Sequence, residues 1–184
     1  QIELRVLAHL SQDSTMIEIL KNKKSDIHSE TASRIFNVPI GDVTSDMRRK
    51  AKEVNFGLIY GMEAFGLSKS LDIEQKEASQ LIESYFSQFP EIKGFLDNIV
   101  LKATKESFTE TLIGRKRYIR ELNSSNFQVK AAGKRIAMNA PIQGTAADIM
   151  KIAMIKVLHK IKELDQTQLL LPVSYTHLRA HETS

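Results

Sequence analysis

The sequence of 184 residues predicts an α+β fold that is rich in helix and has only a minor sheet. Most of the chain places apolar residues three and four positions apart, which is the spacing of one face of a helix. Three short segments have the pattern of strands instead, near residues 2–6, 108–119 and 168–171. The apolar fraction of 42% is enough to fill the core of one ordinary domain.

The first third of the chain predicts one strand followed by helices. Apolar and polar residues alternate over residues 2–6, as in the middle of a strand. A short amphipathic helix is expected near residues 26–36. Ser45 or Asp46 can cap the next helix, which is expected to run to about Gly61.

The middle of the chain predicts two helices and a hairpin. Residues 74–88 have apolar positions at helical spacing until Pro90, and a further helix is expected over 91–105. Residues 108–113 and 117–119 have strand-like composition and are separated by the sequence Gly-Arg-Lys. This arrangement predicts a short hairpin.

The C-terminal part predicts two more helices and the start of a strand. The first helix covers residues 126–139 and ends before Pro141, because proline disfavours helical geometry in the residue before it. The second covers residues 144–164, and a strand begins over 168–171. The apolar stripe of the helix over residues 144–164 is so wide that we expect this helix to be deeply buried. The stripe contains Ala146, Ile149, Met150, Ala153, Met154, Val157, Leu158 and Ile161, with Ile152 and Ile155 widening it.

The composition argues against several classes of protein. No apolar run approaches the roughly 20 residues of a membrane span, and no signal peptide is visible, so no membrane partner is expected. The chain has no cysteine, which excludes disulfides and thiolate metal sites and fits a cytoplasmic location. Residues 172–184 abandon the preceding pattern and are interpreted as a non-native tail. The two histidines of this tail, His177 and His181, are therefore not assigned to a metal.

Positive charge is concentrated in two segments. Residues 47–61 carry a net charge of +3 and residues 113–135 a net charge of +6, whereas the whole chain carries +4. The remainder is therefore acidic. Basic patches on an acidic chain favour a polyanionic partner such as nucleic acid or a nucleotide. Solvated helix faces explain the charge equally well.

Four residues of the first basic segment share one helical face. Arg48, Lys52, Phe56 and Tyr60 follow one another at intervals of four, so they lie within a strip roughly 120° wide and ~18 Å long. The two cations suit phosphate oxygens, and the two rings suit a sugar and base. The spacing alone nevertheless favours an ordinary amphipathic helix with a basic outer face.

Five segments, taken in order, resemble the DNA polymerases of family A, and the bacterial DNA polymerase I type fits best. The segment from Arg48, Arg-x-x-x-Lys-x-x-x-Asn-Phe-Gly-x-x-Tyr-Gly, resembles motif B, the nucleotide-binding helix of the fingers. Gln1-Ile-Glu-Leu-Arg5 resembles the end of motif A, and Asp26-Ile-His28 a motif of the fingers. Thr111–Arg117 and Asn139–Asp148 resemble segments that lead into and through the palm helices. The resemblance covers about residues 1–171.

The resemblance implies a site for the triphosphate of a deoxynucleoside triphosphate (dNTP). Arg48 and Lys52 would hold the triphosphate, and Lys52 would also protonate the departing pyrophosphate as the catalytic residue. His28 would contact a phosphate oxygen. Without the resemblance, His28 would be interpreted as a locally hydrogen-bonded histidine at a helix start.

The same resemblance implies a site for the sugar and base. Phe56 would stack on the nucleotide, and Tyr60 would lie near the template base. Glu3 would exclude a ribose 2′-hydroxyl and would be hydrogen-bonded to Tyr60. Taken alone, Glu3 is only a polar residue at a strand edge.

Five further residues are implied to bind primer–template DNA. Arg135, Asn139 and Gln143 would line the duplex near the primer terminus, with Pro141 breaking the helix between the last two. Amide side chains suit the minor groove, where the acceptors look alike for every base pair. Arg115 and Arg117 would supply charge near the DNA backbone, although a solvated loop is an equally good interpretation.

The resemblance implies the right-hand polymerase fold. Residues 12–125 would form the fingers, residues 1–11 the end of the motif A strand of the palm, and residues 126–171 the palm helices with the start of the motif C strand. Asp148 is interpreted as structural. The intact protein is expected to be a monomeric, template-directed DNA polymerase that uses dNTPs, primer–template DNA and Mg²⁺.

The two Mg²⁺-binding aspartates of the family have no counterpart in this sequence. One would precede Gln1, and the other would follow residues 168–171, where the sequence has Pro172-Val-Ser instead. The chain is therefore expected to be a fragment that is inactive by itself. The alternatives are a non-catalytic DNA-binding module, a degenerate polymerase homologue, or a fragment too incomplete to fold.

Overall fold

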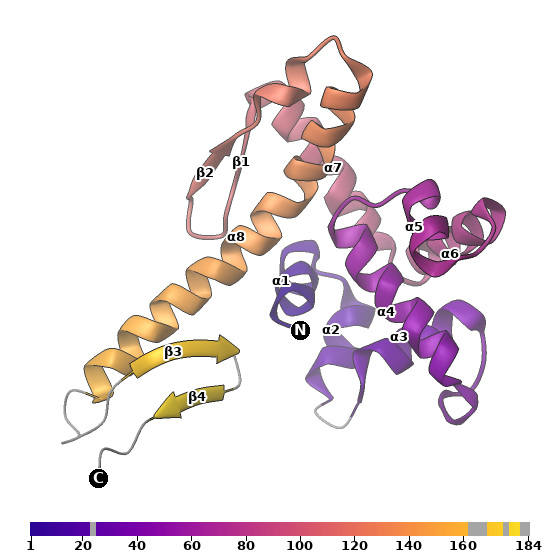
Figure 1. Ribbon diagram of the computed structural model, residues 1–184, viewed down its shortest axis with the longest axis horizontal. Coiled ribbons are helices and arrows are strands. Elements are labelled where there is room, and N and C mark those ends of the chain that lie inside the picture. Colours follow the sequence, from indigo (N-terminus) through magenta and orange to yellow (C-terminus); the bar gives the residue numbers. More distant parts are fainter. Residues whose placement is uncertain (23–24, 162–168, 175–176, 181–184) are drawn as a thin grey trace.

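The computed structural model describes residues 1–22, 25–161, 169–174 and 177–180, with side chains up to residue 161. Figure 1 shows helices α1–α7 gathered in one cluster, with α8 as a long rod that extends beyond it and the β1–β2 hairpin beside α8. The element bounds are α1 Ile2–Ser11, α2 Ser14–Lys21, α3 Ile27–Phe36, η1 Ile40–Asp42, α4 Ser45–Ile59, α5 Ala64–Leu71, α6 Gln75–Gln88, α7 Pro90–Glu106, β1 Phe108–Glu110, β2 Lys116–Tyr118, η2 Arg120–Asn123, α8 Phe127–Ile161, β3 Leu169–Ser174 and β4 His177–Ala180.

The helix-rich α+β fold is confirmed, and several elements form where the sequence predicts them. Helices α3, α6 and α7 agree with the predicted ranges to within one or two residues. The hairpin also forms, with β1 and β2 antiparallel and Phe108 opposite Tyr118. Helix α4 is capped by Thr44, one or two residues earlier than the predicted Ser45 or Asp46, because the Met47 amide donates to Thr44 Oγ1 at 3.2 Å. Such caps satisfy amide groups that have no partner within the helix.

The strand predicted at residues 2–6 is wrong, because these residues form the first turns of α1. Five alternating residues fit a strand and a helix almost equally well. The residues that follow decide between them, since Leu7 and Ala8 are buried directly after Val6. Consecutive buried residues suit a helix packed on a core better than a strand with one exposed face.

The break predicted at Pro141 is also wrong, because α8 is a single helix with Pro141 inside it. Proline lacks an amide proton, so one helical hydrogen bond is missing at this point. Pro141 is itself buried, and so are Ala137 and Ile142 on either side. The burial of residues on both sides of Pro141 favours a continuous helix and outweighs the loss of one hydrogen bond.

The second half of α8 is not deeply buried, which overturns a third expectation. Its buried positions end at Asp148, and the apolar residues beyond are exposed or half-buried. The pattern of a helix shows which face is apolar but not whether another element covers it. The exposed fractions are 39% for Ile149, 42% for Ile152, 56% for Ile155 and 42% for Leu158.

Two apolar cores hold the described residues together. The main core joins α1–α7 and also takes Ile142 and Ala146 from α8. A smaller core of Ala103, Ile119, Leu122 and Ala137 joins α7, η2 and α8. The segment that follows the hairpin, including η2, is therefore packed against both α7 and α8.

The main core contains a buried carboxyl group, Asp13. It caps α2 by accepting a hydrogen bond from the Met16 amide at 2.8 Å, and the residue is fully buried. Burial raises the pKa of Asp13 to about 6. The hydrogen bond from the Met16 amide lowers this pKa, whereas the neighbouring Glu91 carboxylate raises it. Asp13 therefore titrates near neutral pH although it is aspartate.

The raised pKa of Asp13 predicts a pH-dependent stability. Because the folded pKa lies above the unfolded value of 3.8, the contribution of this group is fully present below that value and is lost as pH rises through about 6. Asp13→Asn keeps a capping oxygen and removes the titration. We expect the difference in unfolding free energy between pH 5 and pH 8, measured by urea denaturation, to shrink in this variant.

Asp13→Ala is the control for the cap. It removes both the capping oxygen and the charge, so it should lower the unfolding free energy by about 1 kcal/mol relative to Asp13→Asn at both pH values. An unchanged pH dependence in Asp13→Asn would show that Asp13 does not titrate in this range.

Candidate nucleotide and DNA site

Helix α4 presents opposite faces to the core and to the exterior. Its inner face, with Ala51, Val54 and Ile59, is fully buried in the main core. Its other face carries the four residues that the sequence predicted to lie together. Arg48, Lys52 and Tyr60 are exposed, and Phe56 is half-buried between them. Tyr60 follows the last residue of the helix and belongs to its C-terminal cap.

At the N-terminal end of this face, Arg48 is bound to Asp26 of the neighbouring helix α3. Arg48 Nε lies 2.8 Å from Asp26 Oδ2, and Arg48 Nη2 lies 3.2 Å from Asp26 Oδ1. Burial raises the pKa of Asp26, but the hydrogen bonds from Arg48 and Ser29 outweigh it and bring the pKa to about 2. Asp26 is therefore ionised at neutral pH. Asp26 belongs to one of the motifs that resemble family A, but the sequence predicted no role for it.

His28 is buried in the first turn of α3, below this ion pair. Its Nδ1 atom lies 3.2 Å from Asn55 Nδ2, and its ring centroid lies 5.6 Å from that of Phe56. Burial lowers the pKa of His28, and the charges of Arg48 and Lys52 lower it further, while Asp26 opposes them. The ring is thus neutral at pH 7. Because an amide nitrogen only donates, this pairing leaves the ring proton on Nε2.

Asn55 is a site residue whose role the sequence analysis missed. It is fully buried, and its Nδ2 also donates to Thr31 Oγ1 at 3.1 Å. Asn55 therefore fixes the His28 ring from α4 while tying α4 to α3. A polar residue on the buried side of an otherwise apolar helix face was the available signal.

At the C-terminal end of the face, Tyr60 contacts α1. The Tyr60 hydroxyl donates to Glu3 Oε2 at 3.0 Å, which confirms the predicted hydrogen bond between these two residues. Glu3 lies in the first turn of α1 and not at a strand edge. The contact joins the first helix of the chain to the end of α4.

Gly61 brings α8 against the end of α4. Its φ of +67° is strained for any other residue, and a Cβ atom here would lie 2.9 Å from Arg135 Cγ. The neighbour at this close approach, Arg135, is one of the predicted DNA-binding residues. An open cleft of about 710 Å³, lined by Gly61, Met62, Arg135 and Met138 among others, adjoins this contact.

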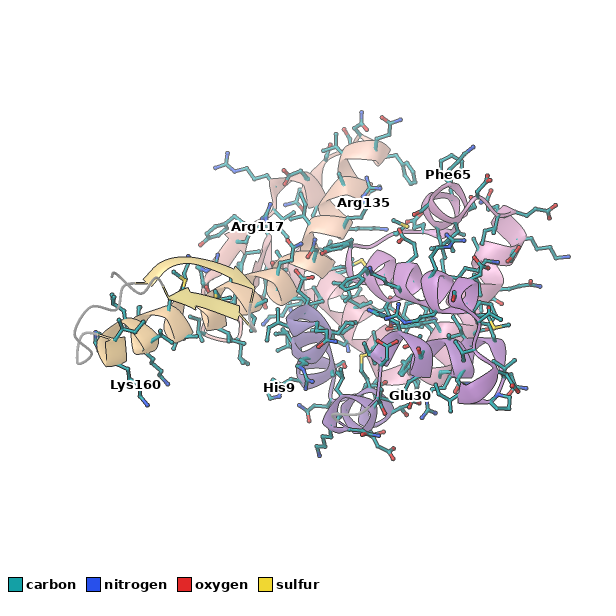
Figure 2. All side chains as sticks on the ribbon, turned by 60° about the horizontal axis from the view of Figure 1, so that its bottom comes forward. His9, Glu30, Phe65, Arg117, Arg135 and Lys160 are labelled. Carbon is teal, nitrogen blue, oxygen red and sulfur yellow. The ribbon has the colours of Figure 1, made fainter. Side chains whose placement is uncertain are left out.

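The three predicted DNA-binding residues of α8 lie on one continuous helix. Arg135 and Gln143 are exposed, and Asn139 is half-buried. Since the helix does not break at Pro141, their spacing of four keeps them on one strip. The Oδ1 atom of Asn139 is buried and has no hydrogen-bond partner among the residues that the structure describes. In Figure 2, Arg135 and Arg117 lie toward the upper side of the view, whereas His9 and Glu30 lie toward the lower side.

The hairpin is attached to α8 by Arg115. Its guanidinium lies 2.9 Å from Asp148 Oδ1 and donates to the Gly144 carbonyl at 3.1 Å. The Leu112 amide also donates a hydrogen bond to Thr145 Oγ1 at 3.0 Å. Arg115 thus has an internal partner, and its side chain is still 51% exposed, so its place near DNA stays a prediction. Arg117 pairs with Thr109 through the backbone of the hairpin, but its exposed side chain forms no ion pair or hydrogen bond with the described residues.

Asp148 is structural, as the sequence analysis proposed. The residue is buried and holds the Arg115 guanidinium. Burial raises its pKa, but hydrogen bonds from Thr111 and Arg115 outweigh this effect and leave the pKa below its usual value. Within the described ranges, no group of three or more histidine or acidic side chains could hold a metal ion. These residues therefore do not fit a resident Mg²⁺.

The Arg115–Asp148 contact predicts unequal effects of two neighbouring arginines. Arg115→Ala leaves a buried carboxylate without its cation, so we expect the unfolding free energy to fall by about 1–3 kcal/mol. Arg117→Ala is the matched control and should change it by less than about 0.5 kcal/mol. Urea denaturation of both variants measures the difference. Equal losses would show that the ion pair contributes nothing specific.

Comparison with known proteins identifies the family. The sequence profile described as DNA polymerase family A matches residues 1–174. A DNA polymerase I of Caldicellulosiruptor bescii is 52% identical over 163 residues, which are 89% of this chain and 19% of that protein. A DNA polymerase I of Geobacillus stearothermophilus is 48% identical over 174 residues, which are 94% of this chain and 20% of that protein. The chain thus spans about a fifth of the length of these relatives.

A solved structure gives the same answer for the fold. The chain is similar to the POL domain of Pol1 from M. smegmatis, solved in complex with DNA primer-template and dNTP. The TM-score is 0.88 at 47% identity, over 94% of this chain and 30% of that one. No helix among the described residues is both long and apolar enough to cross a membrane. The sequence match over residues 1–174 and the shared fold show that this chain belongs to DNA polymerase family A.

Proposed function

We propose that this chain is the nucleotide-binding and DNA-binding part of a template-directed DNA polymerase, which transfers a nucleotidyl group from a dNTP to a primer 3′-hydroxyl. The observation that supports this most is the outer face of α4. Arg48 and Lys52 lie at one end of it, and Phe56 and Tyr60 at the other. The similar Pol1 domain was solved with DNA primer-template and dNTP, which favours the same partners for this chain.

The cations at the N-terminal end of α4 would hold the triphosphate. Arg48 offers a planar fork of donors and Lys52 a compact charge. The Lys52 ammonium group forms no hydrogen bond or ion pair within the described part of the chain, so it would be available to donate a proton to the departing pyrophosphate. His28, neutral and protonated on Nε2, would donate to a phosphate oxygen.

The rings at the C-terminal end of α4 would hold the sugar and the bases. Phe56 would stack on the incoming nucleotide, and Tyr60 would lie near the template base. Glu3, held by Tyr60, would exclude a ribose 2′-hydroxyl. On α8, Arg135, Asn139 and Gln143 would contact the minor groove of the duplex, where their N–H groups can donate to the acceptors that every base pair presents. Arg117 would approach the DNA backbone, with Arg115 holding its hairpin in place.

The wider assignment belongs to the same proposal. Residues 12–125 would be the fingers, with residues 1–11 and 126–171 in the palm, and the intact protein would be a cytoplasmic monomer. It would use Mg²⁺, bound by carboxylates that the described residues do not include. A non-catalytic DNA-binding module is the competing function. It would need the basic surface but not the paired cations and rings of α4.

The proposal predicts that Lys52 acts on the nucleotide. In the complete polymerase that carries this chain, Lys52→Ala should lower kcat/KM for dNTP at least ten- to a hundredfold, because a charged hydrogen bond to the transition state contributes about 1.5–3 kcal/mol. Lys76→Ala, an exposed lysine on α6, is the control and should have little effect. Single-turnover primer extension measures both. Equal effects, or no incorporation by the unaltered protein, would favour the DNA-binding module.

A second prediction concerns sugar selection by Phe56. If Phe56 lies against the nucleotide sugar, its ring offers no hydrogen bond to replace a missing 3′-hydroxyl. Phe56→Tyr adds a phenolic oxygen there, and a new hydrogen bond contributes about 0.5–1.5 kcal/mol or more in a dry site. The ratio of kcat/KM for dNTP to that for dideoxynucleotide should therefore fall severalfold or more, while dNTP incorporation stays near normal.

Phe65→Tyr is the control for this prediction. Phe65 lies on α5 and is 63% exposed, so it gains a hydroxyl away from the proposed sugar site. Its selectivity ratio should match that of the unaltered polymerase. If Phe56→Tyr leaves the ratio unchanged as well, Phe56 is only a packing residue and the placement of the sugar is wrong.

A further inference from the structure

Asp26 lies where helices α3 and α4 meet, and it binds residues of both. On α3 it accepts hydrogen bonds at Oδ2 from the Ser29 amide at 2.9 Å and the Ser29 hydroxyl at 2.8 Å. On α4 it accepts two bonds from Arg48, at 2.8 Å and 3.2 Å. A residue that only capped α3 would need no more than the bond from the Ser29 amide. The additional bonds therefore need another explanation.

The two bonds from Arg48 use one edge of its guanidinium. A guanidinium has five N–H groups, and Asp26 engages those on Nε and on Nη2. The edge formed by Nη1 and the second Nη2 proton has no hydrogen-bond partner among the described residues. That edge has the spacing that binds two oxygens of one phosphate. Arg48 can thus bind Asp26 and a phosphate at the same time.

The two hydrogen bonds from Arg48 to Asp26 fix the orientation of the guanidinium. The Arg48 side chain is 48% exposed and that of Asp26 is 37% exposed, so the net attraction within the pair is small. A free arginine side chain must lose much rotamer freedom when it binds a ligand. Asp26 removes that freedom in advance, and it does so beside His28, which lies two residues further along the chain.

We propose that Asp26 is a positioning residue for triphosphate binding. It holds the Nε edge of Arg48 and so places the other edge next to His28 and Lys52, making one phosphate-binding group from two helices. This inference rests on the proposed function, because it assumes that Arg48 binds the triphosphate. The opposite possibility is that Asp26 competes with the phosphate for Arg48.

The decisive variant is Asp26→Asn in the complete polymerase. Asparagine with its oxygen in the Oδ2 position keeps the Ser29 bonds and the bond from Arg48 Nε, but it loses the negative charge, and its amide nitrogen in the Oδ1 position cannot accept the bond from Arg48 Nη2. We expect KM for dNTP to rise on the order of five- to tenfold, with kcat within about twofold and the thermal midpoint nearly unchanged. Ser29→Ala, which removes only the hydroxyl bond to Asp26, should leave KM near its original value.

A double-mutant cycle with Arg48 separates the possible outcomes. If Asp26 acts through Arg48, adding Asp26→Asn to Arg48→Ala should change KM for dNTP by less than about twofold. A full additional effect would overturn the inference, because Asp26 would then act elsewhere. A lower KM in Asp26→Asn alone would also overturn it and would identify Asp26 as a competitor.

The same cycle distinguishes this inference from the proposed function. If Arg48→Ala raises KM for dNTP but Asp26→Asn does not, the nucleotide site stands and the positioning role is rejected. If Arg48→Ala itself leaves KM unchanged, Arg48 does not bind the triphosphate. Both the assignment of Arg48 and the role of Asp26 then fail together.

Discussion

The burial of one face of α4 is the constraint on which the candidate site depends. Ala51, Val54 and Ile59 are fully buried, so the helix cannot rotate about its axis without exposing apolar surface. The opposite face is therefore held outward, with its cations and rings in a defined order. The apolar packing of α4 thereby decides where the charged and aromatic groups point, although it makes no direct contact with a ligand.

Acidic side chains order the cations of this protein at several points. Asp26 holds Arg48, and Asp148 holds Arg115 against α8. In each case the carboxylate belongs to a different element from the arginine, so the contact also joins two elements. A surface that binds a polyanion has many basic side chains, and flexible side chains lose conformational entropy when they bind a ligand. Carboxylates that hold these side chains in advance reduce that loss, at the cost of some net positive charge.

The continuity of α8 joins the α4 end of the candidate site to the hairpin. Arg135 packs against Gly61 at the end of α4, and Gly144 receives Arg115 from the hairpin two and a half turns later. A break at Pro141 would uncouple these contacts. The buried residues around the proline keep the helix intact, and a rigid rod therefore carries Arg135, Asn139 and Gln143 in one line.

The sequence by itself determined the helix-rich class, helices α3, α6 and α7, the hairpin, and the shared face of Arg48, Lys52, Phe56 and Tyr60, because spacing and turn residues are local properties. It also carried the family motifs, and through them the Glu3–Tyr60 bond. Only the tertiary structure decided that residues 2–6 are helical, that Pro141 lies inside one helix, that Ile155 is exposed, and that Asp26 and Asp148 hold arginines from other elements. Those outcomes depend on which surfaces meet across long stretches of chain, and no local pattern contains that information.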